Sequence, residues 1–222
     1  MLHHFRQRWS ADLCDRLNAG GLPRGYYALI ELSALRTAEA PSPEDAGGGL
    51  LVATTPPQTR FVMSAEKEVY VAKANRISVR HPLGDVVAVL EIVSPGNKDS
   101  RAALSSLVAK SLGLLSRGVN LLIVDLLPPT KRDPEGIHGA IWTELEEGAF
   151  ALPLDKPLTL ASYAAGPPKT AYVEPVGIGD PLPNMPLFLG AFSHVQVPLE
   201  ETYERTWSLC PQPMREHVLQ LA

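Results

Sequence analysis

The sequence predicts a single α/β domain in which a mixed sheet is flanked by helices. The chain of 222 residues is 45% hydrophobic and 20% charged, a composition that can bury one substantial core. Apolar, strand-like runs at residues 85–93 and 119–127 are bounded by Gly and Pro, and leucines recur at helical spacing over residues 99–117 between them. A strand, a helix and a strand joined by short turns form a right-handed parallel crossover.

The chain before this crossover predicts a helix, several strands and a loop. Apolar residues recur at every fourth position of the first segment and indicate an amphipathic helix: Phe5, Trp9, Leu13 and Leu17. Residues 26–32 are rich in aromatic and aliphatic side chains, and residues 60–64 and 69–81 also resemble strands. Residues 37–58 consist mainly of Ala, Pro, Gly, Ser and Thr, which bury too little apolar surface to become ordered, so we expect a mobile loop there.

The chain after the crossover predicts a short helix near residues 141–145 and then a proline-rich arm. Residues 153–198 combine many prolines with short apolar patches, which favours an extended arm over the sheet. Large apolar residues at steps of four predict a closing helix that includes Leu199, Tyr203 and Trp207, and a last short helix is expected over residues 214–221.

These elements indicate one domain over residues 1–222. Its core spans about residues 1–150, and the arm with the closing helices spans about residues 151–222.

The composition restricts the compartment and the partners. No apolar run approaches the roughly 20 residues that span a bilayer, and the first residues lack the apolar segment of a secretory signal. Cys14 and Cys210 are too few for a disulfide framework, so we expect a cytoplasmic protein without a membrane partner. A net charge of −4 and a pI near 5.9 leave no broad basic face, so nucleic acid would require a local patch. The oligomeric state stays open, a homo-oligomer included.

An acidic residue inside the first apolar run is the clearest functional signal. Charge is costly in a buried strand, and both Glu91 and Asp125 stand near the carboxyl ends of the predicted parallel strands, where ligands of α/β sheets bind. A Mg²⁺ ion needs at least two oxygen ligands, and Glu31 can supply the second if its strand neighbours that of Glu91. Asp85 is about 20 Å away along the strand and is excluded from the same coordination sphere.

A lysine would complete such a site by orienting water and offsetting negative charge. Lys110 falls at the edge of the apolar stripe of its helix, from which a long side chain reaches the end of the sheet. Lys98 follows a Pro-Gly turn, and we expect it to be exposed, as a phosphate or solvent contact. The residues leave open the alternative that Glu91 and Lys110 form an ion pair that only ties helix to sheet.

A second acidic cluster surrounds His138. It includes Asp133 and Glu135 in a turn that precedes a helix, where a histidine more often packs or caps than catalyses. Ser94 is interpreted as a turn residue, because the sequence lacks a Gly-x-Ser-x-Gly motif. Zinc is not expected, because the sequence has neither a cysteine pair nor a His-x-x-x-His motif.

Eight segments are similar to the bacterial family called domain of unknown function 4058. They are residues 77–81, 84–85, 91–98, 125–129, 133–142, 157–163, 171–175 and 182–188. The likeness extends over nearly the whole chain and is specific, as in Glu-Ile-Val-Ser-Pro-Gly-Asn-Lys at residues 91–98. It implies a bacterial protein but no activity, because that family has no assigned reaction.

A more distant resemblance is to the Uma-type endonucleases of the PD-(D/E)xK restriction-nuclease-like fold. It rests on the Glu-Ile-Val-Ser-Pro motif at residues 91–95, on Lys110 eight residues before Gly118, and on Asp125 after Val124. The resemblance implies a restriction-endonuclease-like fold, with Glu91 as the metal-binding acid and Lys110 in place of a lysine at the position of Val93. That fold also expects a Pro-Asp dipeptide on the preceding strand, which this chain lacks. Either the strand is lost, the acid comes from elsewhere, or the site holds no metal.

The leading hypothesis is therefore a Mg²⁺-dependent phosphodiesterase of the nuclease type, with nucleic acid as the partner. Glu91, Lys110 and Glu31 are its predicted catalytic residues, and Glu91 and Glu31 its predicted metal ligands. Further site candidates are Asp125, His138 and Lys98. The alternatives are a degenerate nuclease site, or a non-catalytic binding or scaffold module on the same fold.

Overall fold

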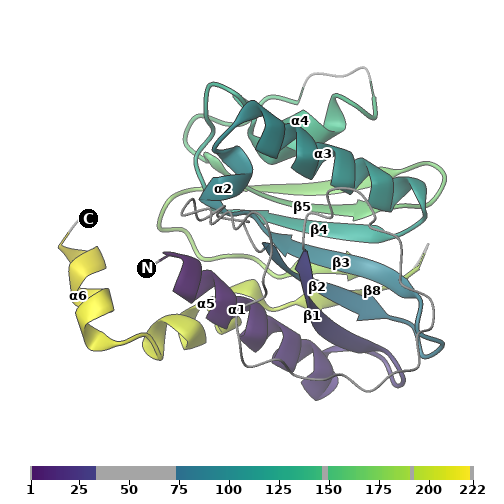
Figure 1. Cartoon of the computed structure of the whole chain (residues 1–222), viewed down its shortest axis with the longest axis horizontal. Helices are drawn as coiled ribbons and strands as arrows, with labels where there is room; N and C mark the ends of the chain where they lie inside the picture. Colours follow the sequence, from purple (N-terminus) through teal and green to yellow (C-terminus); the bar gives the residue numbers. More distant parts are fainter. Residues whose placement is uncertain (1, 34–73, 147–149, 191–192, 221–222) are drawn as a thin grey trace, which may run out of the picture.

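A six-stranded mixed sheet with helices on both faces forms the centre of the molecule (Figure 1). This computed structural model describes residues 2–33, 74–146, 150–190 and 193–220. The strands lie side by side in sequence order, and every neighbouring pair is antiparallel except β3 and β4. They are β1 (Tyr27–Ser33), β2 (Ala74–Arg80), β3 (Val86–Ile92), β4 (Asn120–Asp125), β5 (Leu158–Ala164) and β6 (Thr170–Val176).

The parallel crossover predicted from the sequence is confirmed. It runs from β3 through α2 (Pro95–Lys98) and α3 (Arg101–Ser116) to β4. Ser94 and Asn97 form a capping box at the start of α2, and the Ser100 hydroxyl accepts a hydrogen bond of 3.1 Å from the amide of Ala103 at the start of α3. Gly118 ends the crossover helix with a φ of 78°, a conformation that side chains other than glycine rarely adopt.

Each face of the sheet has its own hydrophobic core. On one face, α1 (Leu2–Arg16) and α5 (Leu199–Ser208) pack with the hairpin of β7 (Met185–Phe188) and β8 (His194–Val197). On the other face, α3 and α4 (Gly136–Trp142) cover the strands β3, β4 and β5. Alternate residues of β3 and β4 enter the two cores, as expected for strands buried on both sides.

Two further elements complete the described chain. A π-type turn, η1 (Leu17–Gly21), follows α1, and the last helix, α6 (Gln212–Leu219), follows α5. The predicted closing helix is confirmed as α5, and the short helix expected near residues 141–145 lies slightly earlier, as α4.

The prediction of an extended arm over residues 153–198 is wrong, because β5 and β6 continue the main sheet and β7 pairs with β8. The prolines mislead because they occupy places where a missing amide is tolerated. Pro175 lies on the edge strand β6, and Pro186 lies in the two-stranded hairpin. The loop expected over residues 37–58 and the strand over residues 60–64 lie outside the described residues.

None of the helices in the described ranges combines the length and apolarity needed to cross a membrane.

Candidate functional site

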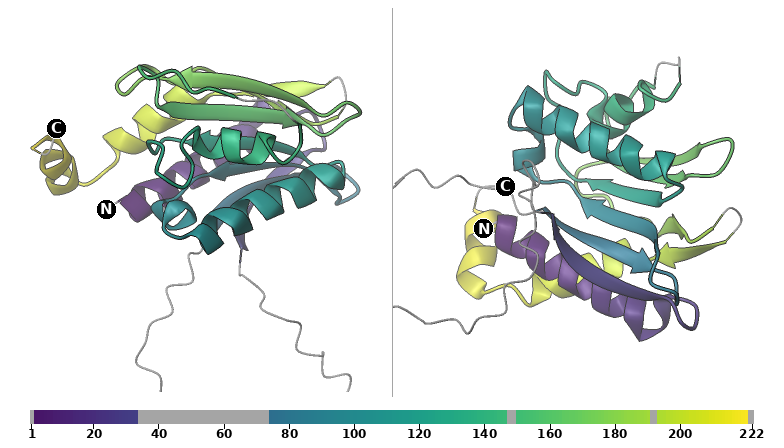
Figure 2. Two further views of the ribbon diagram at one scale, coloured as in Figure 1. Left: turned by 90° about the horizontal axis from the view of Figure 1, so that it is seen from above. Right: turned by 45° about the vertical axis from the view of Figure 1, so that its right-hand side comes forward.

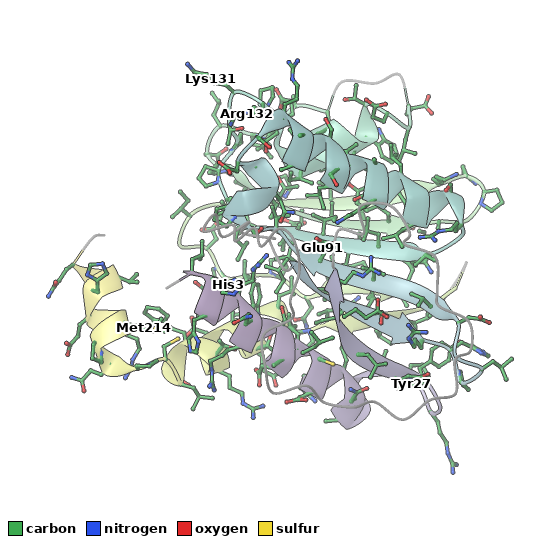
Figure 3. All side chains as sticks on the ribbon, in the orientation of Figure 1. His3, Tyr27, Glu91, Lys131, Arg132 and Met214 are labelled. Carbon is green, nitrogen blue, oxygen red and sulfur yellow. The ribbon has the colours of Figure 1, made fainter. Side chains whose placement is uncertain are left out.

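Three charged residues line up across the first three strands. In the register of the sheet, Glu31 on β1 pairs with Arg76 on β2, which in turn pairs with Glu91 on β3. Glu91 shares the strand face of Val89 and Val93, which belong to the core beneath α3. The row therefore lies on the face of the sheet that α3 covers. Figure 3 labels Glu91.

Glu91 is a buried carboxylate surrounded by cations at a distance. The residue is 5% exposed. Its carboxylate makes no hydrogen bond and no ion pair within 4.0 Å with any other residue that the structure describes, and the nearby cations act on it only through their charge. Burial raises the pKa of Glu91, and the charges of Lys110, Arg76 and Arg6, in that order of strength, oppose the increase. Lys110 thus approaches Glu91 from α3, as the sequence predicted.

Arg6 reaches this end of the sheet from the opposite helix layer. It lies in the first turns of α1 and is itself 6% exposed, and its Nη1 donates a hydrogen bond of 3.4 Å to the carbonyl of Ile92. Burial lowers the pKa of Arg6, and the charge of Glu91 opposes that decrease. The charge of Glu91 thus favours the protonated form of the buried Arg6 guanidinium.

Glu31 is fully engaged by its own neighbours. Its Oε1 accepts hydrogen bonds of 2.7 Å from both the Ser78 hydroxyl and Arg80, and its Oε2 accepts one of 3.0 Å from Arg76. Burial acts to raise the pKa of Glu31, but the hydrogen bonds from Ser78, Arg80 and Arg76 outweigh it and hold the pKa below its usual value. Glu31 is therefore an ionised acceptor whose oxygens are already occupied.

The structure does not bring the two predicted metal ligands together. β2 lies between β1 and β3, so the backbones at Glu31 and Glu91 are about 10 Å apart, and Arg76 stands between them. Within the described ranges, no three His, Cys, Asp or Glu residues are close enough to hold a metal ion. Arg76 was not among the predicted site residues, although its alternation with Ser78 and Arg80 in a predicted strand indicates a polar row.

Among the residues that the structure describes, the cluster has more basic than acidic side chains. Two carboxylates, Glu31 and Glu91, lie near four basic side chains, namely Arg6, Arg76, Arg80 and Lys110. A divalent cation would add to this excess of positive charge, whereas an anion would reduce it. By charge alone, the arrangement suits an anionic ligand better than a metal ion.

Lys98 lies in a different place from the one predicted. The predicted exposure is wrong, because Lys98 is buried, with 5% of its surface exposed. Its Nζ lies 2.8 Å from Asp125 Oδ2 and 2.9 Å from Asp133 Oδ2. It also donates hydrogen bonds to the carbonyls of Leu127 (3.0 Å) and Pro128 (3.4 Å). The expectation failed because these partners come after β4, and only the crossover brings them to the end of β3.

Asp125 and Asp133 depend on this single cation. Burial raises the pKa of Asp125, and the charge and hydrogen bond of Lys98 oppose the increase. Asp133 is 2% exposed and accepts a hydrogen bond of 3.0 Å from the Thr130 amide through its other oxygen. The three charged groups form a closed centre that joins the turn after β3 to the loop after β4.

His138 belongs to a packed cluster rather than to the row of Glu91. It lies on α4, its Nδ1 forms a hydrogen bond of 2.7 Å with the Tyr163 hydroxyl on β5, and its ring packs edge-on against Phe150. Burial lowers the pKa of His138 to about 4, so the imidazole is neutral at pH 7. β4 separates β5 from the strand that carries Glu91.

Two lysine–carboxylate groups therefore occupy the same end of the crossover, and they differ in how fully their charges are paired. Lys98 has two carboxylates in direct contact, whereas Glu91 has several cations near it and, among the residues that the structure describes, none in direct contact. The surroundings of Glu91 are the stronger candidate for a ligand site, because Glu91 itself is not paired with the basic side chains near it that the structure describes. Comparisons of the chain with protein-family models, with curated proteins and with solved structures found no match.

Proposed function

We propose that the sheet face around Glu91 binds a phosphate-bearing ligand. The observation that carries this proposal is a buried carboxylate inside a cluster with an excess of basic side chains. Arginine offers a planar pair of donors that matches phosphate oxygens, and lysine acts as a point charge beside it. Because the cluster is partly withdrawn from water, a phosphate there gains more from each cation than it would on an exposed surface.

The residues of the cluster have separate roles in this proposal. Lys110 comes from α3 and Arg76 from β2, so a phosphate between them joins the crossover helix to the sheet. Glu31 fixes Arg76 and Arg80 through direct ion pairs of 3.0 and 2.7 Å. Glu91 offsets part of the local positive charge and thereby keeps the basic side chains close together without a ligand.

A metal-dependent phosphodiesterase of the nuclease type is the second candidate. It is favoured by one observation, that Lys110 is the strongest electrostatic neighbour of Glu91, as the distant resemblance implies. In this function Glu91 would hold a Mg²⁺ ion, which would supply Lewis-acid chemistry, and Lys110 would orient a water molecule beside it. It also requires a second acidic ligand, and Glu31 is held by three donors on another strand.

Calorimetric titration separates the two functions. Phosphate binding predicts heat with a thymidine dinucleotide or with inorganic phosphate, and at least a tenfold loss of affinity in Lys110→Met and Arg76→Met. Arg117→Met, which removes an exposed cation just after α3, is the matched control and should bind like wild type.

The same instrument tests the metal. The nuclease function predicts heat with Mn²⁺ that disappears in Glu91→Ala, together with Mn²⁺-dependent cleavage of a labelled oligonucleotide. Phosphate binding that is lost in Lys110→Met, without Glu91-dependent Mn²⁺ heat, supports the binding function. If neither phosphate nor Mn²⁺ produces heat, both candidate functions are refuted.

A further inference from the structure

The last helix of the chain is poorly supported by the rest of the molecule. α6 makes no extensive contact with any other helix or strand in the described part of the chain, and it stands apart from the sheet in Figure 1 and in the left view of Figure 2. It has only 8 residues, whereas isolated helices shorter than about 12–15 residues are marginal in water. A stable α6 therefore needs a surface on which to pack.

The side chains of α6 are arranged for such packing. At about 100° per residue, Met214 and Val218 form one apolar stripe, and Arg215 and His217 lie on its two sides. Glu216 lies on the opposite side, where it accepts a hydrogen bond of 2.6 Å from Gln212. Val218 is 37% exposed, and Leu209, just before the helix, is 56% exposed. The stripe is thus apolar with basic edges.

A groove on the other side of the molecule has the complementary character. It lies between α3 and α4, has a volume of about 920 Å³, and is lined mainly by apolar and small side chains. Leu104, Val108 and Leu112 of α3 form one wall, and Ala140 of α4 lies on the other. Glu144 and Glu146, both exposed, stand on the rim beyond α4, and the exposed Arg132 also lines the groove. The groove is thus mainly apolar, and its rim beyond α4 is acidic.

The two surfaces also match in length. The wall from Leu104 to Leu112 extends over about 12 Å at 1.5 Å per residue, and the 8 residues of α6 have the same length. Placing the apolar stripe of α6 in the groove brings Arg215 and His217 to the level of the rim, where the two exposed glutamates lie.

The groove of the same chain is out of reach of its own α6. α5 packs with α1 on one face of the sheet, and α3 and α4 lie on the other face. Residues 209–211, which join α5 to α6, span at most about 11 Å, whereas crossing the sheet from one helix layer to the other requires about 20 Å. A copy of α6 that packs in this groove must therefore come from another molecule.

We propose that α6 packs into the α3–α4 groove of a second copy of this chain. Reciprocal exchange of the two helices gives a two-fold symmetric dimer in which each copy supplies one helix and one groove. The contact is independent of the cluster at Glu91, so variants of that cluster leave it intact. In this arrangement the apolar stripe of α6 is buried in the groove, and its basic edges lie next to the acidic residues of the rim.

Light scattering after gel filtration tests the proposal on the full chain. The wild type is expected to be a dimer at about 100 µM, and Val218→Glu a monomer, because the substitution puts a charge in the apolar stripe. Glu216→Ala, on the opposite side of α6, is the matched control and should remain a dimer. A wild type that is monomeric at this concentration overturns the proposal, whatever else binds the groove.

Two further variants identify the groove. Ala140→Trp fills the groove and should give a monomer. Arg215→Glu on α6 alone, or Glu144→Arg with Glu146→Arg on the rim alone, should weaken the dimer. All three substitutions together reverse the charges on both surfaces and should restore the dimer. Mixing Val218→Glu with Ala140→Trp should produce a heterodimer through the one intact helix and groove. A dimer that Ala140→Trp leaves unchanged shows that another surface joins the copies, and the proposal fails.

Discussion

Removing the ammonium of Lys98 is the most direct test of the buried centre at the end of the crossover. We consider Lys98→Met, which keeps an unbranched side chain of similar length and removes the charge. In the native structure the Lys98 side chain is 4% exposed, and its Nζ lies within 3.0 Å of Asp125, Asp133 and the Leu127 carbonyl. The variant leaves two carboxylates buried without a cation.

The expected loss of stability is large. Removing one partner of a buried ion pair costs about 3–5 kcal/mol, because the remaining charge stays buried and unpaired. Lys98 serves two carboxylates whose side chains are 2% and 0% exposed, so we expect a loss of at least about 4 kcal/mol at pH 7. Most domains have only about 5–15 kcal/mol in total, so the variant should be close to unfolding.

The loss should also depend on pH with a definite sign. Burial already raises the pKa of Asp125, and without Lys98 the cation that opposes this increase is gone, so protonation of Asp125 relieves the unpaired charge. The defect should therefore be largest above neutral pH and become smaller as the pH falls below about 5.

Urea unfolding followed by tryptophan fluorescence measures both effects. Lys131→Met is the matched control, because Lys131 is exposed in the neighbouring loop (Figure 3), and it should change the free energy of unfolding by less than about 0.5 kcal/mol. Adding Asp125→Asn and Asp133→Asn to Lys98→Met should recover most of the loss and gives a folded reference if Lys98→Met does not fold. A loss below about 1 kcal/mol, or one that does not change with pH, would refute the argument.

Three further predictions concern single groups. Glu91→Gln should be more stable than wild type at pH 7, because burial raises the pKa of Glu91 and so makes its charged form costly. The gain in stability should become smaller in acid, where the wild-type carboxyl is protonated. Urea denaturation at pH 7 and pH 4 measures both effects, and a variant less stable than wild type at pH 7 would contradict the prediction. His138→Gln should reduce the acid sensitivity of folding, because a pKa of about 4 against 6.5 for free imidazole makes the wild type lose up to about 3 kcal/mol as the pH falls from about 6.5 to 4. Gly118→Ala should lower the free energy of unfolding by about 1 kcal/mol, because Gly118 has a φ of 78°. Gly113→Ala, inside α3, should instead raise it by up to about 1 kcal/mol. Thermal unfolding compares the two variants, and equal changes in stability would count against the backbone explanation.

The crossover could be predicted from the sequence because its signals are local. The apolar β-branched runs, the leucine spacing between them and the glycine at residue 118 each depend only on near neighbours, and they agree with one another. β5 and β6 could not be recognised in the same way. Their place in the sheet depends on which strand pairs with β4, and the prolines around them resemble those of an irregular arm.

The site was predictable only in part, for a similar reason. Helical periodicity was enough to direct Lys110 toward the sheet end where Glu91 lies. It could not indicate that β2 would insert Arg76 between Glu31 and Glu91, because strand order is a tertiary property. The exposure predicted for Lys98 failed on the same ground, since its acidic partners are remote in sequence.

The contrast between Lys98 and Glu91 shows where on this end of the sheet a ligand would matter. Both charges are buried to the same degree, and a buried charge without direct partners is costly. The fold satisfies Lys98 completely, so an added ligand could only compete with contacts that already exist. Around Glu91 the basic side chains of the described residues make no ion pair within 4.0 Å and outnumber the acids, so under the proposed function a phosphate would add contacts to cations that Glu91 leaves free. An evolved structure that needed only stability at this position could replace Glu91 by an apolar residue, as at the flanking positions Val89 and Val93 on the same face.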